Sequence, residues 1–141
     1  MSGALLDTHA LYWLVSGTEQ LATDALIAIG RGQRDGNLTV SPITAWEIAL
    51  AARKTRNAPG LGDMLASDWF RAALRVTSAT IAPINQRTAV EAANVVAATG
   101  HRDPGDCYLI ATARVRKMAI ITRDDAMREM SVSGYLEVIR C

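Results

Sequence analysis

Short apolar runs alternate along the chain with longer segments whose apolar residues recur every three or four positions. The short runs predict strands at residues 3–6, 38–40, 80–84, 118–122 and 135–139. The longer segments predict helices at 8–15, 20–31, 42–56, around Trp69 to Leu74, 87–98, 103–115 and 125–130. Strands that alternate with helices are typical of a parallel sheet covered by helices on both faces. We therefore expect an α/β fold with a central, mostly parallel β-sheet flanked by helices.

Turn-forming residues give the expected limits of these elements. Ser41-Pro42 is typical of a helix start, because proline suits the first helical position. The glycines at positions 30, 32 and 36 are expected to break the second helix. The sequence Asn57-Ala58-Pro59-Gly60 is the clearest loop signal. No repeat or linker divides the chain, so one domain is expected over residues 1–141.

Composition and charge limit the possible classes of protein. The 141 residues are 50% hydrophobic and 21% charged, with a net charge of +1, as in a globular domain. No apolar run reaches the roughly 18 residues of a membrane span, and no basic segment precedes an apolar stretch at the N-terminus, so we expect a cytoplasmic protein. Cys107 and Cys141 form no metal-binding pattern and are expected to be free thiols of a reducing compartment.

Acidic residues occur where predicted strands give way to helices. Asp7 follows the first strand, and Asp124 follows the strand at 118–122. Asp103 and Asp106 open a helix, and Glu47 lies inside another. Strand ends and the helix starts beyond them converge on one edge of an α/β sheet. Carboxylates gathered there would raise one another's pKa values unless a hard divalent cation neutralised them, so the pattern indicates metal-dependent chemistry on phosphates.

Each acid also has a purely structural interpretation. Asp7, Asp103 and Asp124 could be helix N-caps, and Asp106 could be a favoured charge in a first helical turn. Thr44 and Glu47 match the spacing of a capping box, in which the glutamate bonds back to the cap amide. These interpretations stay open for the residues taken singly. The placement of all five acids at one expected edge favours a common site.

Other polar residues add candidates without deciding between the interpretations. His9 and His101 lie near the acids in sequence, where a packing role is favoured over a ligand role. Basic clusters follow two helices, at Arg53, Lys54 and Arg56 and at Arg114, Arg116 and Lys117. They are either solvated helix ends or a rim that contacts a phosphate backbone.

Several other chemistries are excluded by missing motifs. The chain has no nucleophile elbow, no Walker loop and no dinucleotide-binding glycine pattern. A receiver domain would need an acidic pair after the first strand, where only Asp7 stands, and a lysine after the last strand, where Arg140 stands.

Four segments, in order, resemble the PIN-domain ribonucleases, specifically VapC-type toxins of bacterial toxin–antitoxin pairs. The segments are Leu5-Leu6-Asp7-Thr8-His9-Ala10-Leu11-Tyr12-Trp13, Ser41-Pro42-Ile43-Thr44-Ala45-Trp46-Glu47-Ile48-Ala49, His101-Arg102-Asp103-Pro104-Gly105-Asp106 and Ile121-Thr122-Arg123-Asp124. The resemblance covers essentially the whole chain. Two positions depart from the family pattern: Gly105 stands where a bulky apolar residue is usual, and Cys107 where arginine is usual.

The resemblance implies an RNA-cleaving enzyme that uses Mg²⁺ or Mn²⁺. The implied catalytic and metal-binding residues are Asp7, Glu47, Asp103, Asp106 and Asp124, holding one or two ions. Thr8 is expected to orient a water or a carboxylate. Arg53, Lys54, Arg102, Arg114 and Arg123 are candidates, with Thr8, for RNA contact.

The same resemblance implies partners. These are a structured RNA such as tRNA or rRNA, a cognate VapB-type antitoxin that docks beside the site near Trp13, Trp46 or Trp69, and a second copy of the chain. A catalytically weak or inactive PIN-like module that binds RNA or protein is the alternative. In that alternative the acids would serve only as caps, and metal would add little stability.

Overall fold

Strands and helices alternate in the computed structural model, which describes residues 3–141. Within these residues five strands form one sheet: β1 (Ala4–Leu6), β2 (Leu38–Val40), β3 (Thr80–Ile81), β4 (Ala119–Thr122) and β5 (Val138–Arg140). The helices of the same residues are α1 (Thr8–Ser16), α2 (Thr23–Asp35), α3 (Pro42–Ala51), α4 (Ala66–Thr77), α5 (Gln86–Thr99), α6 (Pro104–Arg116) and α7 (Asp125–Val132). The predicted α/β fold is confirmed.

All neighbouring strands of this sheet run parallel, in the order β3-β2-β1-β4-β5. The central strand β1 pairs in matched register on both sides, with Leu6 opposite Val40 of β2 and Ile121 of β4. The carboxyl ends of these three strands therefore lie level with one another. Whatever follows each strand begins at the same edge of the sheet.

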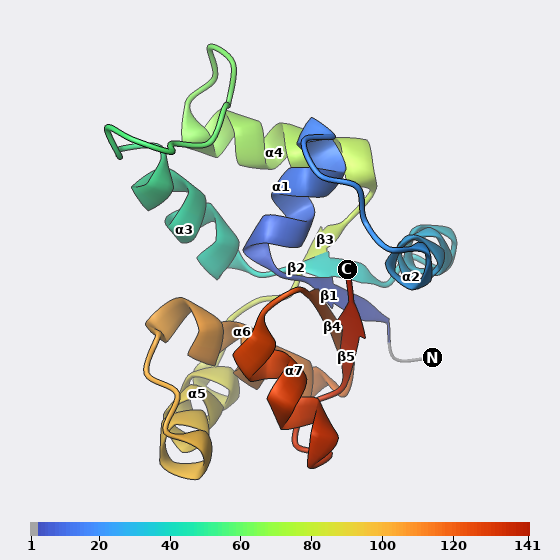
Figure 1. Ribbon diagram of the computed structural model, residues 1–141, viewed down its shortest axis with the longest axis vertical. Helices are drawn as coiled ribbons and strands as arrows, with labels where there is room; N and C mark the ends of the chain where they lie inside the picture. Colours follow the sequence, from blue (N-terminus) through green and yellow to red (C-terminus); the bar gives the residue numbers. More distant parts are fainter. Residues whose placement is uncertain (1–2) are drawn as a thin grey trace.

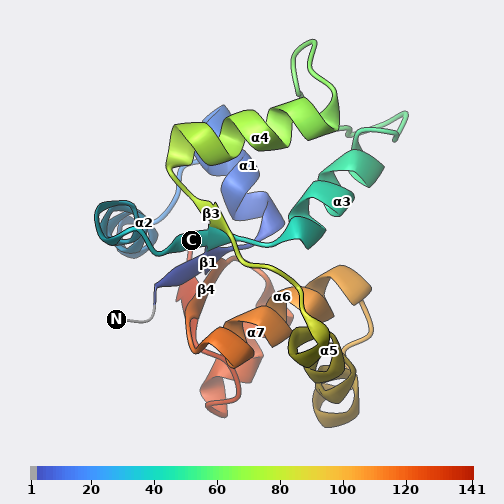
Figure 2. The same cartoon turned by 180° about the vertical axis from the view of Figure 1, so that it is seen from behind.

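Helices cover both faces of the sheet (Figures 1 and 2). Side chains alternate between the faces of a strand, so Leu6 of β1 packs into one apolar cluster and Leu5 into another. The first cluster joins α1, α2 and α4, and the second joins α5, α6 and α7. No helix within residues 3–141 has both the length and the apolar character needed to cross a membrane.

The second helix differs from its prediction. Helix α2 continues through Gly30 and Gly32 and ends at Gly36, whose φ of 72° lies in the left-handed region. The expected break at Gly30 and Gly32 is therefore wrong. The two glycines also have different surroundings. Gly30 faces open space, whereas a Cβ on Gly32 would lie 2.9 Å from the Cβ of Leu38. Gly32 therefore lets α2 approach β2 closely.

Helix α3 ends at Ala51, five residues before the predicted end at Arg56. Residues 52–58 are exposed and do not pack against a neighbouring element. Because packing supplies most of the stability of a helix in a protein, the helix does not continue past Ala51. The predicted loop at 57–60 is confirmed, and Asn57 adopts a φ of 56° there. The predicted strands at 80–84 and 135–139 are shorter in the structure, at Thr80–Ile81 and Val138–Arg140.

The two glycines of α2 give a matched test of this packing. Replacing Gly32 by alanine should lower the free energy of unfolding by about 1–3 kcal/mol, because the added methyl meets Leu38. Replacing Gly30 by alanine should raise it by about 0.5–1 kcal/mol, because the site is open and alanine favours the helix. Urea denaturation of both variants measures these changes, and equal effects would contradict the close approach of α2 to β2.

Candidate metal centre

Three helices begin near one another with an aspartate at the N-cap position. Asp7 accepts a hydrogen bond from the amide of Ala10 at 2.7 Å at the start of α1. Asp103 caps α6 through the amide of Asp106 at 2.9 Å, and Asp124 caps α7 through the amide of Met127 at 2.9 Å. The capping interpretation is therefore correct for these three acids. Capping uses one oxygen of each carboxylate, and in Asp7 the other oxygen accepts a hydrogen bond from the Thr122 hydroxyl.

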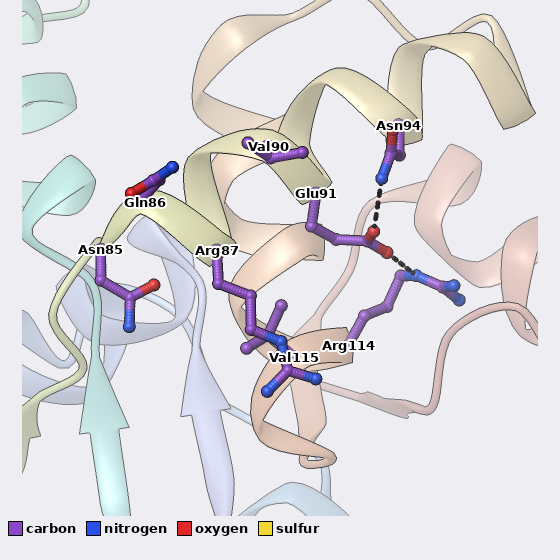
Figure 3. A pocket seen from close by; sticks show the side chains of 8 residues that line it. All are labelled: Asn85, Gln86, Arg87, Val90, Glu91, Asn94, Arg114 and Val115. Carbon is purple, nitrogen blue, oxygen red and sulfur yellow. Dashed lines mark hydrogen bonds and ion pairs between the residues drawn. The ribbon is translucent and has the colours of Figure 1, made fainter.

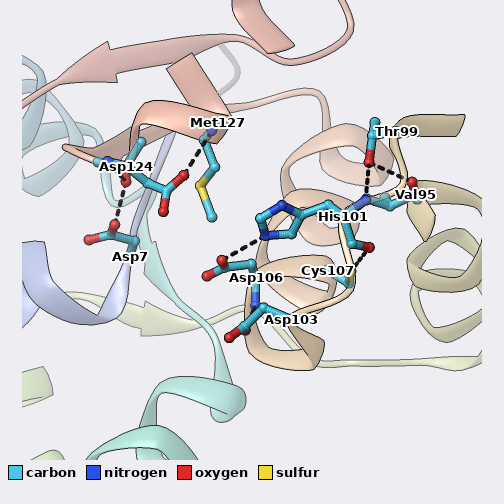
Figure 4. A network of polar contacts seen from close by, with 10 residues as sticks. Asp7, Val95, Thr99, His101, Asp103, Asp106, Cys107, Asp124 and Met127 are labelled. Atoms are coloured by element: carbon cyan, nitrogen blue, oxygen red, sulfur yellow. Dashed lines mark hydrogen bonds and ion pairs between the residues drawn. The ribbon is translucent and has the colours of Figure 1, made fainter. Parts of the chain in front are cut away.

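These acids gather where the order of the strands reverses. The chain proceeds from β1 outward to β2 and β3, then crosses to β4 and β5 on the other side. Ligands of open parallel sheets bind outside the carboxyl ends of the strands at such a point. A cavity of about 410 Å³ lies there, lined by Asp7, Thr8, His9, Trp13, Glu47, Asp103, Asp106, Leu109, Arg123 and Asp124. Figure 4 shows Asp7, Asp106 and Asp124 near one another, each from a different part of the chain. The structure thus brings together all five acids that the sequence singled out.

Glu47 reaches this cavity from the side of α3. Ser41, and not Thr44, caps that helix, accepting from the amide of Ile43, so the capping-box interpretation of Thr44 and Glu47 is wrong. The hydroxyl of Thr8 instead donates to Oε1 of Glu47 at 2.6 Å, and the Thr44 hydroxyl lies 3.0 Å from that of Thr8. These contacts hold the glutamate against α1 and turn its carboxylate toward the aspartates.

Asp106 is held by a histidine that is itself fixed at both ends of its backbone (Figure 4). Nε2 of His101 lies 2.8 Å from Oδ2 of Asp106. The amide of His101 donates to the hydroxyl of Thr99 at 3.1 Å, and its carbonyl accepts from the thiol of Cys107 at 3.2 Å. The sequence favoured a packing role for His101, whereas the structure gives it direct contact with an acid. Cys107, which departs from the family pattern, anchors that histidine.

Burial and mutual repulsion shape the electrostatics of the cavity. Burial raises the pKa of Asp7, an effect that hydrogen bonds from Thr122 and Ala10 oppose. Burial also raises the pKa of Glu47, against the hydrogen bond from Thr8, and the charges of Asp106 and Asp103 raise it further. The pKa of Asp106 is raised by burial and by the charge of Asp103, while His101 lowers it. A cation in the cavity would offset these costs.

The donor atoms present suit a hard divalent cation. One carboxylate oxygen from each of Glu47, Asp103 and Asp106 lies within 4.8 Å of the other two. Mg²⁺, Mn²⁺ and Ca²⁺ prefer such oxygen ligands. Asp7 and Asp124 line the same cavity and complete its acidic wall. The residues present therefore fit a divalent metal ion.

Arg123 is the predicted RNA-contact arginine that lies in this cavity. Its guanidinium stacks over the Trp13 ring at 4.4 Å from the centroid and bonds to Glu19 and to the carbonyl of Gln20. His9 also lies beside Trp13, with ring centroids 5.5 Å apart. One part of the cavity wall is therefore acidic, and another part is formed by Arg123, Trp13 and His9.

The remaining basic candidates lie elsewhere. Arg53 and Lys54 are exposed just beyond α3, and Arg102 is exposed beside Asp103. Arg114 lies near the far end of α6 and borders a separate cavity of about 780 Å³ (Figure 3). There its Nε donates to Glu91 at 2.7 Å, and its guanidinium stacks on Tyr135. The structure does not bring Arg114 to the acids.

Two threonines support the site although the sequence did not predict that role for them. The Thr122 hydroxyl donates to Oδ2 of Asp7 and accepts from the amide of Asp124. Thr44 joins the hydroxyl of Thr8. A signal existed in both cases: Thr122 is the last residue of a strand beside an acid, and Thr44 shares a helix face with Glu47 at a spacing of three.

Comparisons with known proteins agree with this geometry. A family model described as PIN domain matches residues 4–132. None of the curated proteins matches the chain.

Similar solved structures include a VapBC-5 toxin–antitoxin member from Mycobacterium tuberculosis, 20% identical over 100% of both chains with a TM-score of 0.62. A toxin–antitoxin complex from Klebsiella pneumoniae is 22% identical over 97% of this chain and 96% of that chain, with a TM-score of 0.62. VapBC2 from Rickettsia felis, bound to a promoter DNA fragment, is 10% identical over 98% of each chain with a TM-score of 0.68. At such identities the likeness is one of fold.

The pairing of Arg114 with Glu91 predicts a pH-dependent contribution to stability. Hydrogen bonds from Arg114 and then Asn94 lower the pKa of Glu91 below its ordinary value of 4.5. The pair therefore stabilises the fold above that value, and the contribution is lost as the pH falls through the folded-state pKa. Glu91→Gln should lower the free energy of unfolding by about 0.5–1 kcal/mol at pH 7, and the difference between wild type and variant should be smaller at pH 3. Urea denaturation at both pH values tests this, and a constant difference would contradict the assignment.

Proposed function

The chain belongs to the PIN domain family, and on that premise we propose that it is the toxin of a toxin–antitoxin pair, a metal-dependent endoribonuclease that hydrolyses RNA phosphodiester bonds. PIN domains are generally metal-dependent nucleases. Solved structures that share this fold include toxin–antitoxin proteins from Mycobacterium tuberculosis and Klebsiella pneumoniae. Both findings support the proposal.

The observation that carries the proposal is the convergence of five carboxylates on one cavity at the reversal point of the sheet. A binding module has no use for a cluster in which burial and neighbouring carboxylates raise the pKa values of Asp7, Glu47 and Asp106. A nuclease does, because carboxylates hold the cations that act on phosphates. The cavity also opens beside Arg123, a cation suited to a phosphate backbone.

In the proposed mechanism Glu47, Asp103 and Asp106 would hold Mg²⁺ or Mn²⁺, and Asp7 and Asp124 would complete the site. When bound, the ion would supply an activated water at neutral pH and stabilise charge on the phosphate. His101 fixes one oxygen of Asp106, leaving the other to face the cavity.

Hydroxyl groups keep two further carboxylates in the orientation that the mechanism needs. Thr8 donates to Glu47, and Thr122 donates to Asp7. Each hydrogen bond favours the ionised carboxylate, which is the form that binds metal.

RNA is the proposed substrate, contacted through its backbone. Arg123 lies in the cavity, and Arg53, Lys54 and Arg102 are exposed outside it. We leave Arg114 out of this set because Glu91 and Tyr135 engage it at the far end of α6. Phosphate contacts position RNA without reading its sequence, so tRNA and rRNA are both compatible with this arrangement.

A cognate antitoxin is the proposed inhibitor. An apolar groove of about 510 Å³ runs between α1, α4 and the preceding loop, lined in part by Tyr12, Leu61, Met64 and Trp69. Tyr12 lines this groove and Trp13, the next residue of α1, lines the acidic cavity, and we propose that a bound peptide crosses α1 from one to the other. An arginine from such a peptide would pair strongly with the carboxylates. Trp69 is only 7% exposed and contributes to the core, whereas Trp46 is 47% exposed on α3.

A homodimer and a cytoplasmic location complete the proposal. Exposed Trp46 and Leu50 lie one turn apart on α3 and offer an apolar surface to a second copy. Both cysteines are free, as a reducing compartment requires.

Replacing Asp7 by asparagine tests the proposed activity. The change keeps the shape of the α1 cap but removes a charge from the cavity, and cleavage of a broad RNA pool with Mn²⁺ or Mg²⁺ should fall by about a hundredfold or more. EDTA should abolish cleavage by the wild type. Gel analysis of the RNA measures both effects.

Asp125→Asn is the matched control for this experiment. Asp125 is an exposed first-turn acid of α7 that does not line the cavity, so its variant should cleave like the wild type. Undiminished cleavage by a folded Asp7→Asn protein, or wild-type cleavage that survives EDTA, would contradict the proposed function.

A further inference from the structure

The second residue of α6 is a glycine that lies directly against the carboxylate of Glu47. A Cβ built on Gly105 would stand 2.5 Å from Oε2 of Glu47 and 2.7 Å from its Cδ. Both distances are far below van der Waals contact. Any other residue at position 105 would therefore compete with Glu47 for the same space.

Backbone conformation does not explain this glycine. The glycines with positive φ are at positions 3, 17, 36, 62, 100 and 134, and Gly105 is not among them. Its helical backbone would accept any L-residue, and alanine would favour the helix over glycine. Position 105 is therefore glycine because a side chain there would meet Glu47, and not because of its backbone conformation.

Because Gly105 has no side chain, the carboxylate of Glu47 can lie close to the other acids. Thr8 holds Oε1 of Glu47 on one side, and Gly105 leaves room for Oε2 on the other. In that position one oxygen of Glu47 lies within 4.8 Å of oxygens of both Asp103 and Asp106. The N-terminus of α6 also favours a negative charge.

We propose that Gly105 is a positioning residue of the metal centre: its lack of a side chain lets Glu47 approach Asp103 and Asp106 closely enough to share one divalent cation. This inference rests on the proposed function and extends it to a residue that contacts neither metal nor RNA. It also gives a physical reason for a position where the sequence departs from the family pattern.

Gly105→Ala should separate metal binding from folding. The added methyl meets the far end of a flexible side chain, so Glu47 can swing aside and the fold survives. The unfolding temperature in EDTA should equal or exceed that of the wild type, since alanine favours the helix. The affinity for Mn²⁺, measured by calorimetry on metal-free protein, should fall about tenfold or more.

Two further variants show whether the effect acts through Glu47. Removing the side chain in Glu47→Ala should weaken Mn²⁺ binding and also remove the clash, so Gly105→Ala should have no further effect on affinity in that background. Gly30→Ala makes the same change on a helix with open space around it. It should leave Mn²⁺ affinity at the wild-type value.

The outcomes distinguish this inference from the proposed function. Wild-type Mn²⁺ affinity in Gly105→Ala would overturn the inference and leave the proposed function standing. An equal loss of affinity with and without the Glu47 side chain would also overturn it, because Gly105 would then act by another route. Failure of the wild-type protein to bind Mn²⁺ would overturn the proposed metal centre and the inference with it.

Discussion

The matched parallel register of β1 with β2 and β4 is the constraint on which the rest of the structure depends. It sets the ends of three strands level, so Asp7, the Ser41 cap of α3 and Thr122 all lie at one edge of the sheet. Helix N-termini then point toward the space where the acids gather. Their amides and the nearby threonine hydroxyls supply the hydrogen bonds that make a cluster of carboxylates tolerable.

Capping and clustering are consequently two uses of the same side chains. One oxygen of Asp7, Asp103 or Asp124 completes a helix, and the residue still contributes charge to the cavity. The arrangement carries a cost, because burial raises the pKa of Asp7, Glu47 and Asp106 and the neighbouring charges add to it. A divalent cation bound to these carboxylates would neutralise their mutual repulsion. This is the reason to interpret the site as a metal centre.

Periodicity and strand–helix junctions were enough to predict the fold and to bring Asp7 and Asp124 to one edge, because both depend on local sequence. The family resemblance predicted that Thr8 would orient a water or a carboxylate, but that this carboxylate is Glu47 was not predictable, since Glu47 imitates a capping box with Thr44 and lies 39 residues from Thr8. Gly32 was expected to break a helix and Gly105 was seen only as a departure from the family pattern. Their close approach to Leu38 and Glu47 shows why a side chain is absent at each position. Arg114 belongs to the helix of Asp106 but lies about two turns further along it.

Crystals grown with Mn²⁺ would test the metal centre most directly, through the anomalous scattering of the ion. If the proposed metal centre exists, a peak should appear in the acidic cavity, within coordination distance of carboxylate oxygens from Glu47, Asp103 and Asp106. Ordered carboxylates with no peak between them, at Mn²⁺ concentrations that saturate binding in solution, would contradict it.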